Sequence, residues 1–255
     1  SDTGLYRAVW YRRTFNPPAR RPSERILLHF GAVDYRAKVW VDGSFATEHE
    51  GGYTPFWVDI TELVGSGPKH EIVVRAEDDP GDLAKPRGKQ DWQRNPHAIW
   101  YPRTTGIWQG VWLERVPEVR IAELHWASNL DRWEVSFHAR ILGPIQQDLR
   151  FRVTLEVGEH LLAEDMYTVV GGEVHRAIAL SDPGIDDFRN ELLWSPSSPT
   201  LIKAFVELID EHGVTLDRVR SYTALRSFTA QGGRVLLNGR PYPLRMVLDQ
   251  GYWPD

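Results

Sequence analysis

Apolar and polar residues alternate along most of the chain. Between residues 132 and 141 the odd positions are apolar and the even positions are polar. Side chains that point alternately to opposite faces produce this period of two in a half-buried antiparallel strand. The pattern therefore predicts a strand over 132–141 whose inner face carries Trp133, Val135, Phe137, Ala139 and Ile141.

The same kind of pattern recurs over most of the sequence. Ten further strands are predicted, at 25–30, 35–41, 56–60, 71–76, 107–115, 120–126, 150–157, 174–180, 201–210 and 217–225. Asp42-Gly43 follows one of them and indicates a hairpin turn, because that turn requires positive φ at its central residues. Sustained helical periodicity over ten or more residues is missing, so the fold class is predicted to be all-β.

Two breaks divide the chain into three predicted parts. The first break, near Val116-Pro117-Glu118, separates a domain at 1–118 from one at 119–228. The second follows residue 228, where 229–255 contains the turn Asn238-Gly239 and a predicted apolar strand at 244–248. Because the chain starts at a serine and stops directly after this apolar run, we expect a fragment of a longer protein.

Composition narrows the class of partner. The 255 residues contain 30 basic and 35 acidic side chains, and the net charge of −5 argues against a broad nucleic-acid surface. No apolar run approaches the roughly 20 residues of a membrane-spanning helix, so no membrane partner is expected. The absence of cysteine excludes disulfides and thiolate metal sites.

One long irregular region, 80–105, is the main candidate for function. Loops of this length in a compact domain are usually functional or disordered, and this one is rich in aromatic residues. Trp92 and Trp100 fit either packing or stacking on a sugar. Arg103 and Asp91 fit either hydrogen bonds to sugar hydroxyls or a salt-bridged loop.

Other polar clusters have simpler interpretations. Glu48-His49-Glu50 lacks a further ligand at a suitable spacing, so neither a metal nor any other cofactor is predicted. The acidic run 77–79 is interpreted as solvated turn charges. Asn190-Glu191 precedes the end of a sandwich rather than a catalytic strand. The strand tryptophans are predicted to pack: Trp40, Trp57, Trp108 and Trp112.

Several motifs together resemble glycoside hydrolase family 2, the family of β-galactosidases, β-glucuronidases and β-mannosidases. In chain order they are WYRRTF at 10–15, LHFGAVDYRAKVWVDG at 28–43, HEGGYTPF at 49–56, TGIWQGVWLE at 105–114, LWSP at 193–196 and NGRP at 238–241. The resemblance covers the whole chain. It implies a jelly-roll sugar-binding domain, an immunoglobulin-like sandwich, and the first strand of a (β/α)8 barrel.

Active sites of such barrels lie at the C-terminal ends of their strands. A strand at 244–248 would therefore present four substrate-contact candidates: Asp249, Gln250, Tyr252 and Trp253. In the family two glutamates on later barrel strands act in a retaining mechanism, so no catalytic residue is expected in this chain and the chain alone is predicted to be inactive. Asp249-Gln250-Gly251 departs from the family's Arg-His-Glu, so the identity of the substrate sugar cannot be inferred from this segment.

Three functions remain open at this point. The first is the non-catalytic N-terminal portion of a glycoside hydrolase, with a carbohydrate substrate and its own barrel as partners. The second is a free carbohydrate-binding module that uses Trp92, Trp100 and Tyr101 for stacking. The third is a scaffold sandwich that mediates contacts between subunits. Self-association is common in the family and stays open here. The compartment is undetermined, although the lack of cysteines and glycosylation sequons fits a cytoplasmic protein.

Overall fold

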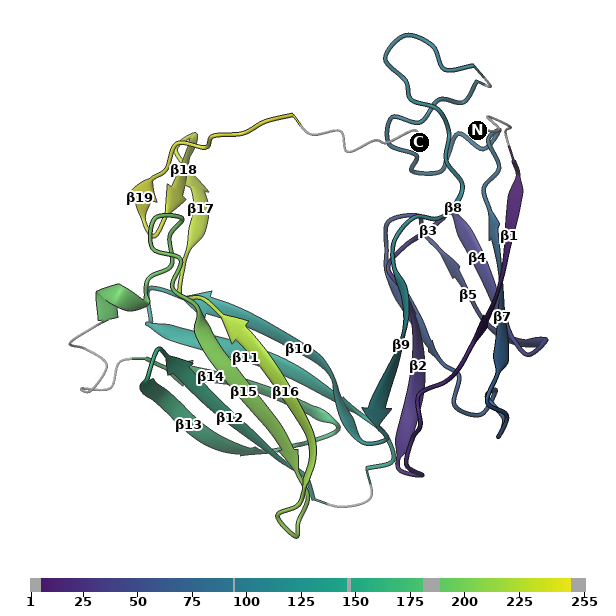
Figure 1. Ribbon diagram of the computed structural model, residues 1–255. Helices are drawn as coiled ribbons and strands as arrows, with labels where there is room; N and C mark the ends of the chain where they lie inside the picture. Colours follow the sequence, from purple (N-terminus) through teal and green to yellow (C-terminus); the bar gives the residue numbers. More distant parts are fainter. Residues whose placement is uncertain (1–5, 94, 146–147, 181–188, 249–255) are drawn as a thin grey trace. The chain divides into compact units, whose positions relative to one another are not determined.

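The computed structural model describes residues 6–93, 95–145, 148–180 and 189–248. Its elements are almost entirely antiparallel strands, as the alternating pattern predicts (Figure 1). The chain divides into two compact units, one built up to Val116 and one over Pro117–Val247. Among the residues that the structure describes, no helix has the length and apolar character that a membrane crossing requires.

The first unit is a sandwich of two sheets. One sheet has the order β1-β7-β4-β5, and the other has the order β6-β2-β9. The first sheet contains β1 (Ala8–Phe15), β7 (His70–Glu77), β4 (Arg36–Val41) and β5 (Ser44–Glu50). The second contains β6 (Phe56–Asp59), β2 (Glu24–Phe30) and β9 (Val111–Pro117). The short strands β3 (Val33–Asp34) and β8 (Gly106–Ile107) pair with each other.

Inward-facing residues of both sheets form one core in this unit. Phe30, Val39 and Val74 are buried within it, and the ring of Phe30 stacks on Phe56 at 4.6 Å. The turn between β4 and β5 has φ values of 48° at Asp42 and 81° at Gly43. These values confirm the hairpin that the sequence predicts, because asparagine-like residues and glycine tolerate the left-handed region.

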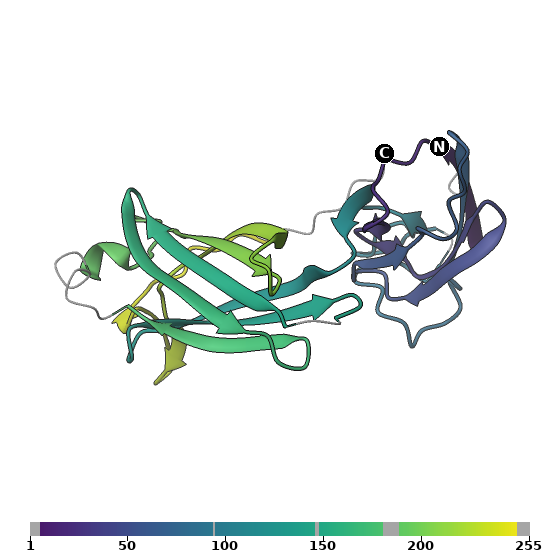
Figure 2. The ribbon, with the colours of Figure 1, turned by 90° about the horizontal axis from the view of Figure 1, so that it is seen from below.

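The second unit has the strand arrangement of an immunoglobulin-like sandwich. One sheet is β10-β11-β14 and the other is β13-β12-β15-β16, so the first, second and fifth strands lie in one sheet (Figure 2). The strands are β10 (Arg120–Asn129), β11 (Glu134–Leu142), β12 (Arg150–Val157), β13 (His160–Thr168), β14 (Glu173–Ala179), β15 (Ile202–Ile209) and β16 (Thr215–Thr223).

Alternation along these strands builds a continuous core. Along β11, Val135, Phe137, Ala139 and Ile141 are buried, as the sequence predicts. Trp133 differs, because the chain turns there with φ of 50° and β11 starts one residue later. Its ring still packs against the core.

The segment after the second sandwich forms a small separate sheet. It contains β17 (Phe228–Gln231), β18 (Arg234–Leu237) and β19 (Arg240–Pro241). The strand predicted at 244–248 is not formed, since no neighbouring strand among the described residues supplies backbone partners there. The single strand predicted at 107–115 is interrupted, because β8 ends at Ile107 and β9 begins at Val111.

The strand tryptophans lie mostly outside the cores. Trp57, Trp108 and Trp112 are 45%, 51% and 49% exposed. The ring of Trp112 stacks on His29 at 4.9 Å, and Trp40 stacks on Trp10 at 5.7 Å. The rings of Trp40, Trp57 and Trp112 lie on the outer faces of the sheets, because their strand neighbours point into the core. Trp108 lies between β8 and β9, and its ring makes an edge-on contact with Tyr53 at 5.8 Å.

Candidate functional site

The long loop of the first unit leaves β7 at Asp78 and returns at β8. Figure 1 shows it extending past the ends of β3 and β8. Inside the loop the amide of Asp91 donates to the carbonyl of Tyr101 at 2.8 Å, and the amide of Tyr101 donates to the carbonyl of Lys89 at 2.9 Å. These bonds close a smaller loop between residues 90 and 101, which carries the predicted aromatic residues.

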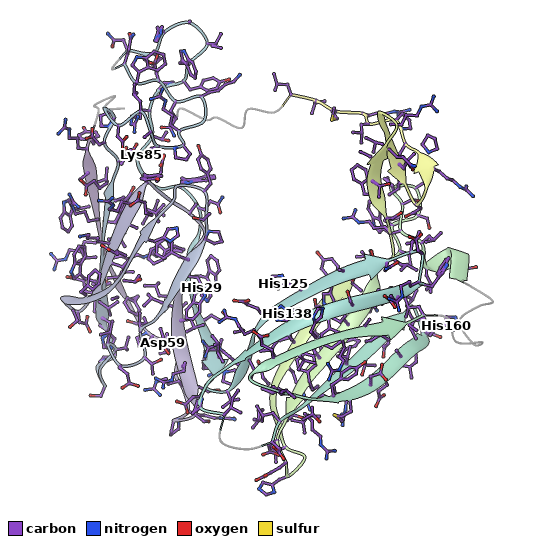
Figure 3. The ribbon with its side chains drawn as sticks, turned by 180° about the vertical axis from the view of Figure 1, so that it is seen from behind. His29, Asp59, Lys85, His125, His138 and His160 are labelled. Carbon is purple, nitrogen blue, oxygen red and sulfur yellow. The ribbon has the colours of Figure 1, made fainter. Side chains whose placement is uncertain are left out.

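A buried carboxylate ties the two ends of this loop together. Asp78 is 3% exposed, and one of its oxygens lies 2.5 Å from Nζ of Lys85. Its other oxygen pairs with Nη2 of Arg103, whose side chain is 5% exposed. Lys85, labelled in Figure 3, also lies 5.2 Å over the ring of Tyr35. Buried charges are tolerated when they are paired, so this cluster holds both flanks of the loop in one arrangement.

A second anchor connects the loop to β3. Nε2 of Gln90 donates to Oδ2 of Asp34 at 3.1 Å, and the amide of Thr104 donates to Oε1 of Gln90 at 2.8 Å. Burial raises the pKa of Asp34; the Gln90 hydrogen bond acts in the opposite direction. A Cβ at Gly52 would lie 2.6 Å from Oδ1 of Asp34, so glycine is needed for this close approach.

Asp91 is held by hydrogen bonds from other residues of the loop. It is fully buried, and its oxygens accept hydrogen bonds from the amides of Gln93 and His97 and from Nδ1 of His97, at 2.7 to 3.0 Å. Burial raises the pKa of Asp91, but the bonds from Gln93 and His97 outweigh it and keep the pKa below its ordinary value. This geometry favours an anchor inside the loop over a direct contact with sugar hydroxyls.

The predicted tryptophans of the loop meet each other. Trp92 and Trp100 make an edge-on contact with ring centroids 5.3 Å apart, and His97 contacts Trp92 at 5.1 Å. The guanidinium of Arg87 lies 5.1 Å from the Trp92 ring. Trp92 remains 38% exposed, so packing and an accessible ring surface occur together. A partly exposed, immobilised aromatic pair can stack on the apolar face of a sugar.

Arg103 combines the two interpretations that the sequence left open. Its ion pair with Asp78 makes it a salt-bridged loop residue. Its Nε and Nη1 atoms are buried and have no hydrogen-bond partner among the described residues. Two unsatisfied donors on a buried guanidinium leave capacity for an oxygen acceptor at the base of the loop, near Asp78.

The sequence missed most of the groups that hold this site. Asp78 was interpreted as a solvated turn charge, and this interpretation is wrong because the residue is buried. Asp34 and Gln90 are separated by 56 residues in the sequence, so the periodicity of a single strand cannot link them. The other four predicted contacts, Asp249, Gln250, Tyr252 and Trp253, lie outside the described residues.

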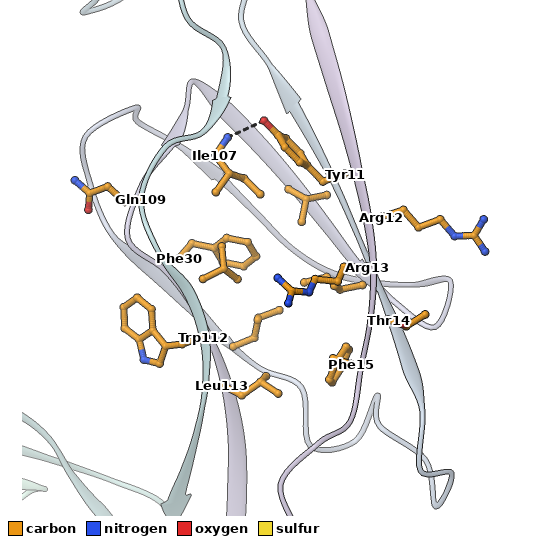
Figure 4. A pocket seen from close by; sticks show the side chains of 14 residues that line it. Tyr11, Arg12, Arg13, Thr14, Phe15, Phe30, Ile107, Gln109, Trp112 and Leu113 are labelled. Atoms are coloured by element: carbon orange, nitrogen blue, oxygen red, sulfur yellow. Dashed lines mark hydrogen bonds between the residues drawn. The ribbon is translucent and has the colours of Figure 1, made fainter. Parts of the chain in front are cut away.

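A separate groove opens between the edge strands β1 and β9 of the same unit (Figure 4). Its volume is about 680 Å³, and its apolar lining includes Leu28, Phe30 and Leu113. Figure 4 shows Arg13 pointing from β1 toward β9, whereas Arg12 points away. The amide of Ile107 donates to the hydroxyl of Tyr11 at the upper end, at 3.2 Å. Alternation along β1 was the signal for this inward arginine.

Comparisons with known proteins agree with the motifs. Residues 4–117 match the sugar-binding domain of glycosyl hydrolases family 2. A β-galactosidase from Thermoanaerobacter pseudethanolicus is 28% identical over 94% of this chain and 31% of its own length. A β-glucuronidase from Paenibacillus borealis is 24% identical over 92% of this chain and 39% of its own length. The resemblance to family 2 that the sequence motifs predict is confirmed.

A solved structure shows the same fold. The β-glucuronidase of Bacteroides uniformis superimposes with a TM-score of 0.72 at 22% identity, covering 95% of this chain and 29% of that one. The chain thus spans between about three tenths and four tenths of the length of these relatives. The all-β fold class is confirmed by both the structure and this likeness.

Proposed function

Starting from a first unit that is a family 2 glycosyl hydrolase sugar-binding domain, we propose that this chain is the non-catalytic N-terminal portion of a glycoside hydrolase. Its two sandwiches would support a catalytic barrel formed by residues outside this chain. The relatives named β-galactosidase and β-glucuronidase support this proposal, because the chain matches 31% and 39% of their lengths.

The observation that carries the proposal is an exposed apolar segment. Met246, Val247 and Leu248 are 80%, 90% and 82% exposed, and Leu244 is 46% exposed. Contiguous apolar surface of this kind indicates an interaction partner. A barrel whose first strand includes 244–248 would bury these side chains and supply the backbone partners that the strand lacks.

The carboxylates of the first unit support a location of catalysis outside it. Hydrolysis with retention needs two carboxyl groups about 5 to 5.5 Å apart, one as nucleophile and one as acid and base. Asp78 is held by Lys85 and Arg103, and Asp34 is held by Gln90, all in buried positions. We therefore place both catalytic glutamates in the barrel, with Asp249, Gln250, Tyr252 and Trp253 at its substrate rim.

The long loop contributes the sugar-binding surface in this proposal. Trp92 and Trp100 supply ring surface, and Arg103 supplies donors for an oxygen of the substrate. Asp91 and Asp78 keep the loop in place. The sugar itself stays open, since the relatives' names include both galactosidases and glucuronidases.

One observation favours the alternative of a free carbohydrate-binding module. The loop is anchored entirely within the first unit, through Asp78 and Gln90, and its Trp92 ring is partly exposed without any barrel. A module that binds sugar by itself needs this kind of preformed surface.

Activity and binding measurements separate the two functions. We expect the 255-residue chain to release no aryl alcohol from nitrophenyl glycosides, and a chain extended to the length of its relatives to do so. Hydrolysis by the 255-residue chain above the buffer rate would overturn the assignment of catalysis to other residues.

Calorimetric titration with oligosaccharides tests the module. Saturable binding by the 255-residue chain that is lost in Trp100→Ala would favour the free module. The matched control is Trp112→Ala, which removes a half-exposed tryptophan from the outer face of a sheet in the same unit. No binding by either protein would favour the supporting role.

A further inference from the structure

The groove between β1 and β9 leaves one side of the first sandwich open. Among its lining residues are Phe30 and Val74 of the inner strands, which are 0% and 3% exposed. Burial is lost toward the two flanking strands, where Arg13 is exposed and Val111 is 42% exposed. Alternation nevertheless places both on the inner faces of β1 and β9, because their neighbours two positions along, such as Leu113, pack against the core.

Both strands that flank the groove are edge strands. β1 ends the sheet order β1-β7-β4-β5, and β9 ends the order β6-β2-β9. Within the part of the chain that the structure describes, no further strand pairs with the outer side of either one. An edge strand presents backbone N–H and C=O groups without a ladder partner. The groove therefore combines apolar surface with two free backbone edges, which is the combination that an added extended strand uses.

A cation without a partner points into this groove. Figure 4 shows the side chain of Arg13 directed from β1 toward β9. Its guanidinium has no hydrogen bond or ion pair to any residue that the structure describes, and the residues that line the groove include no acid. The neighbouring Arg12 points away and pairs with Glu71 at 2.6 Å. Charge complementarity at Arg13 thus favours an occupant that carries a carboxylate.

We propose that this groove holds one extended strand of the parent protein, formed by residues outside this chain. The strand directs apolar side chains into the groove and pairs one acidic side chain with Arg13. A strand fits better than a small amphipathic acid, because it also supplies partners for the backbone edges of β1 and β9.

The lining favours a permanent occupant over a reversible partner. Phe30 and Val74 belong to the core that holds the first unit together, so an occupant of the groove extends that core. A segment of the same polypeptide is present at high effective concentration and can fill such a position at all times. The inference rests on the proposed function in one respect, namely that the parent protein is longer than these 255 residues.

Fluorescence polarisation with a labelled synthetic peptide tests the chemistry of the groove. The probe is a capped peptide of about nine alternating leucines and threonines, close to the lengths of β1 and β9, with glutamate as its central residue. A lysine added at each end discourages self-association. We expect saturable binding to the 255-residue chain. A second peptide with glutamine at the centre should bind roughly tenfold more weakly, because it lacks the charge-assisted hydrogen bond to Arg13.

Variants of the two adjacent arginines separate the groove from the rest of the strand. Arg13→Gln should weaken binding of the glutamate peptide roughly tenfold and leave binding of the glutamine peptide unchanged. Arg12→Gln is the matched control on the same strand and should bind both peptides as the unmodified chain does. Arg13→Glu should prefer a peptide with lysine at its centre. Hydrogen exchange should slow in β1 and β9 when the glutamate peptide binds, and stay unchanged in the inner strand β4.

Several results would reject the proposal. They are no saturable binding of the glutamate peptide and equal binding by Arg13→Gln and the unmodified chain. In either case Arg13 serves only to protect a free edge from self-association. Binding of sodium octanoate without binding of the peptide would assign the groove to small amphipathic acids. A dimer in sedimentation that Arg13→Gln dissociates would assign it to a second copy of this chain.

A chain extended to the length of its relatives tests the source of the strand. In that chain β1 and β9 should already be protected from exchange, and the glutamate peptide should not bind, because the protein's own strand occupies the groove. An extended chain that hydrolyses nitrophenyl glycosides and still binds the peptide would reject this inference and leave the proposed function intact. An extended chain with β1 and β9 protected but without hydrolysis would reject the proposed function alone.

Discussion

The two units of this chain are both antiparallel sandwiches, yet they bury different chemistry. Among the residues that the structure describes, the core of the second unit contains 19 buried apolar residues and the core of the first contains 10. Most of the buried polar or charged residues that the structure describes lie in the first unit: Asp34, Thr61, His70, Asp78, Gln90 and Asp91. The second unit contributes Arg120 and Thr223 to this group.

The difference is between apolar burial, which holds a sandwich together, and polar burial, which fixes the position of a loop. Apolar burial is non-directional and holds a sandwich together without positioning any particular loop. Hydrogen bonds and ion pairs are directional, and in the first unit four of the six buried polar groups act on the long loop. The unit with the smaller apolar core is thus the one that fixes a candidate binding surface.

Removing a ring from the second core should have the largest effect. Phe137 stacks on Phe151 at 5.4 Å and also contacts Trp126 and Tyr167. We expect Phe137→Ala to lower the free energy of unfolding of this unit by about 3 to 5 kcal/mol, because it leaves a cavity among aromatic neighbours. Hydrogen exchange should accelerate in β11 and β12 and stay unchanged in β4 and β7.

The control for this change is Tyr222→Ala, which removes a 66% exposed ring from β16 of the same unit. It should alter the free energy of unfolding by no more than about 0.5 kcal/mol. Equal losses in the two variants would show that the second unit does not depend on its apolar core in the way described.

Removing the buried carboxylate of the first unit should come next. Asp78→Asn leaves Lys85 and Arg103 buried without their anion. Breaking a buried pair from one side costs about 3 kcal/mol or more, and here the loss should fall on the loop before the sheets. Hydrogen exchange and limited proteolysis should both rise within 80–105, while protection in β11 and β12 persists.

Asp82→Asn is the matched control for that loop. Asp82 is exposed, and its carboxylate accepts a hydrogen bond from the amide of Ala84 at 3.0 Å. The loop should remain protected in this variant. If Asp78→Asn also left the loop protected, the buried ion cluster would not be what holds it.

A smaller effect should appear in the pH dependence of the first unit. Nδ1 of His70 lies 2.5 Å from Oδ2 of Asp42, and Nε2 of His70 bonds to the carbonyl of Gly67 at 2.8 Å. The hydrogen bond to Asp42 raises the pKa of His70 above 6.5, and the hydrogen bond to His70 lowers the pKa of Asp42 below 3.8.

His70 and Asp42 affect the stability of the first unit in different pH ranges. The contribution of His70 is fully present below pH 6.5 and is lost as the pH rises through its raised folded-state pKa. The contribution of Asp42 is present above pH 3.8 and is lost as the pH falls through its lowered folded-state pKa. Urea unfolding of the first unit, followed by NMR signals from β4 and β7, should therefore show decreasing stability as the pH rises from about 6 to about 9.

In His70→Gln this decline should flatten, since glutamine does not titrate. A decline of the same size in the variant would assign the pH dependence to other groups. The second unit should show no matching change when its own signals from β12 are followed in the same titration.

Local pattern was sufficient for many of the strands and for the resemblance to the family. Alternation along 132–141 and 150–157 placed the inward residues of β11 and β12 correctly, because strand geometry alone decides which side chains share a face. The turn at Asp42-Gly43 needed only local backbone chemistry. The ordered motifs between 10 and 114 led to the sugar-binding domain that the comparison confirms.

Tertiary structure decided the rest. Asp78 lies in an acidic run that is typical of a solvent-exposed turn. It is buried because Lys85 and Arg103, from the two ends of the loop, pair with its carboxylate. The predicted strand at 244–248 did not form, since a strand exists only where another backbone lies beside it. The register of β10, β11 and β14 likewise places His125, His138 and His175 side by side, although they are far apart in the sequence. The face of a sheet that a side chain occupies is set within one strand and can be predicted from the local sequence. The pairing of strands and of buried charges depends on residues that are distant in the sequence.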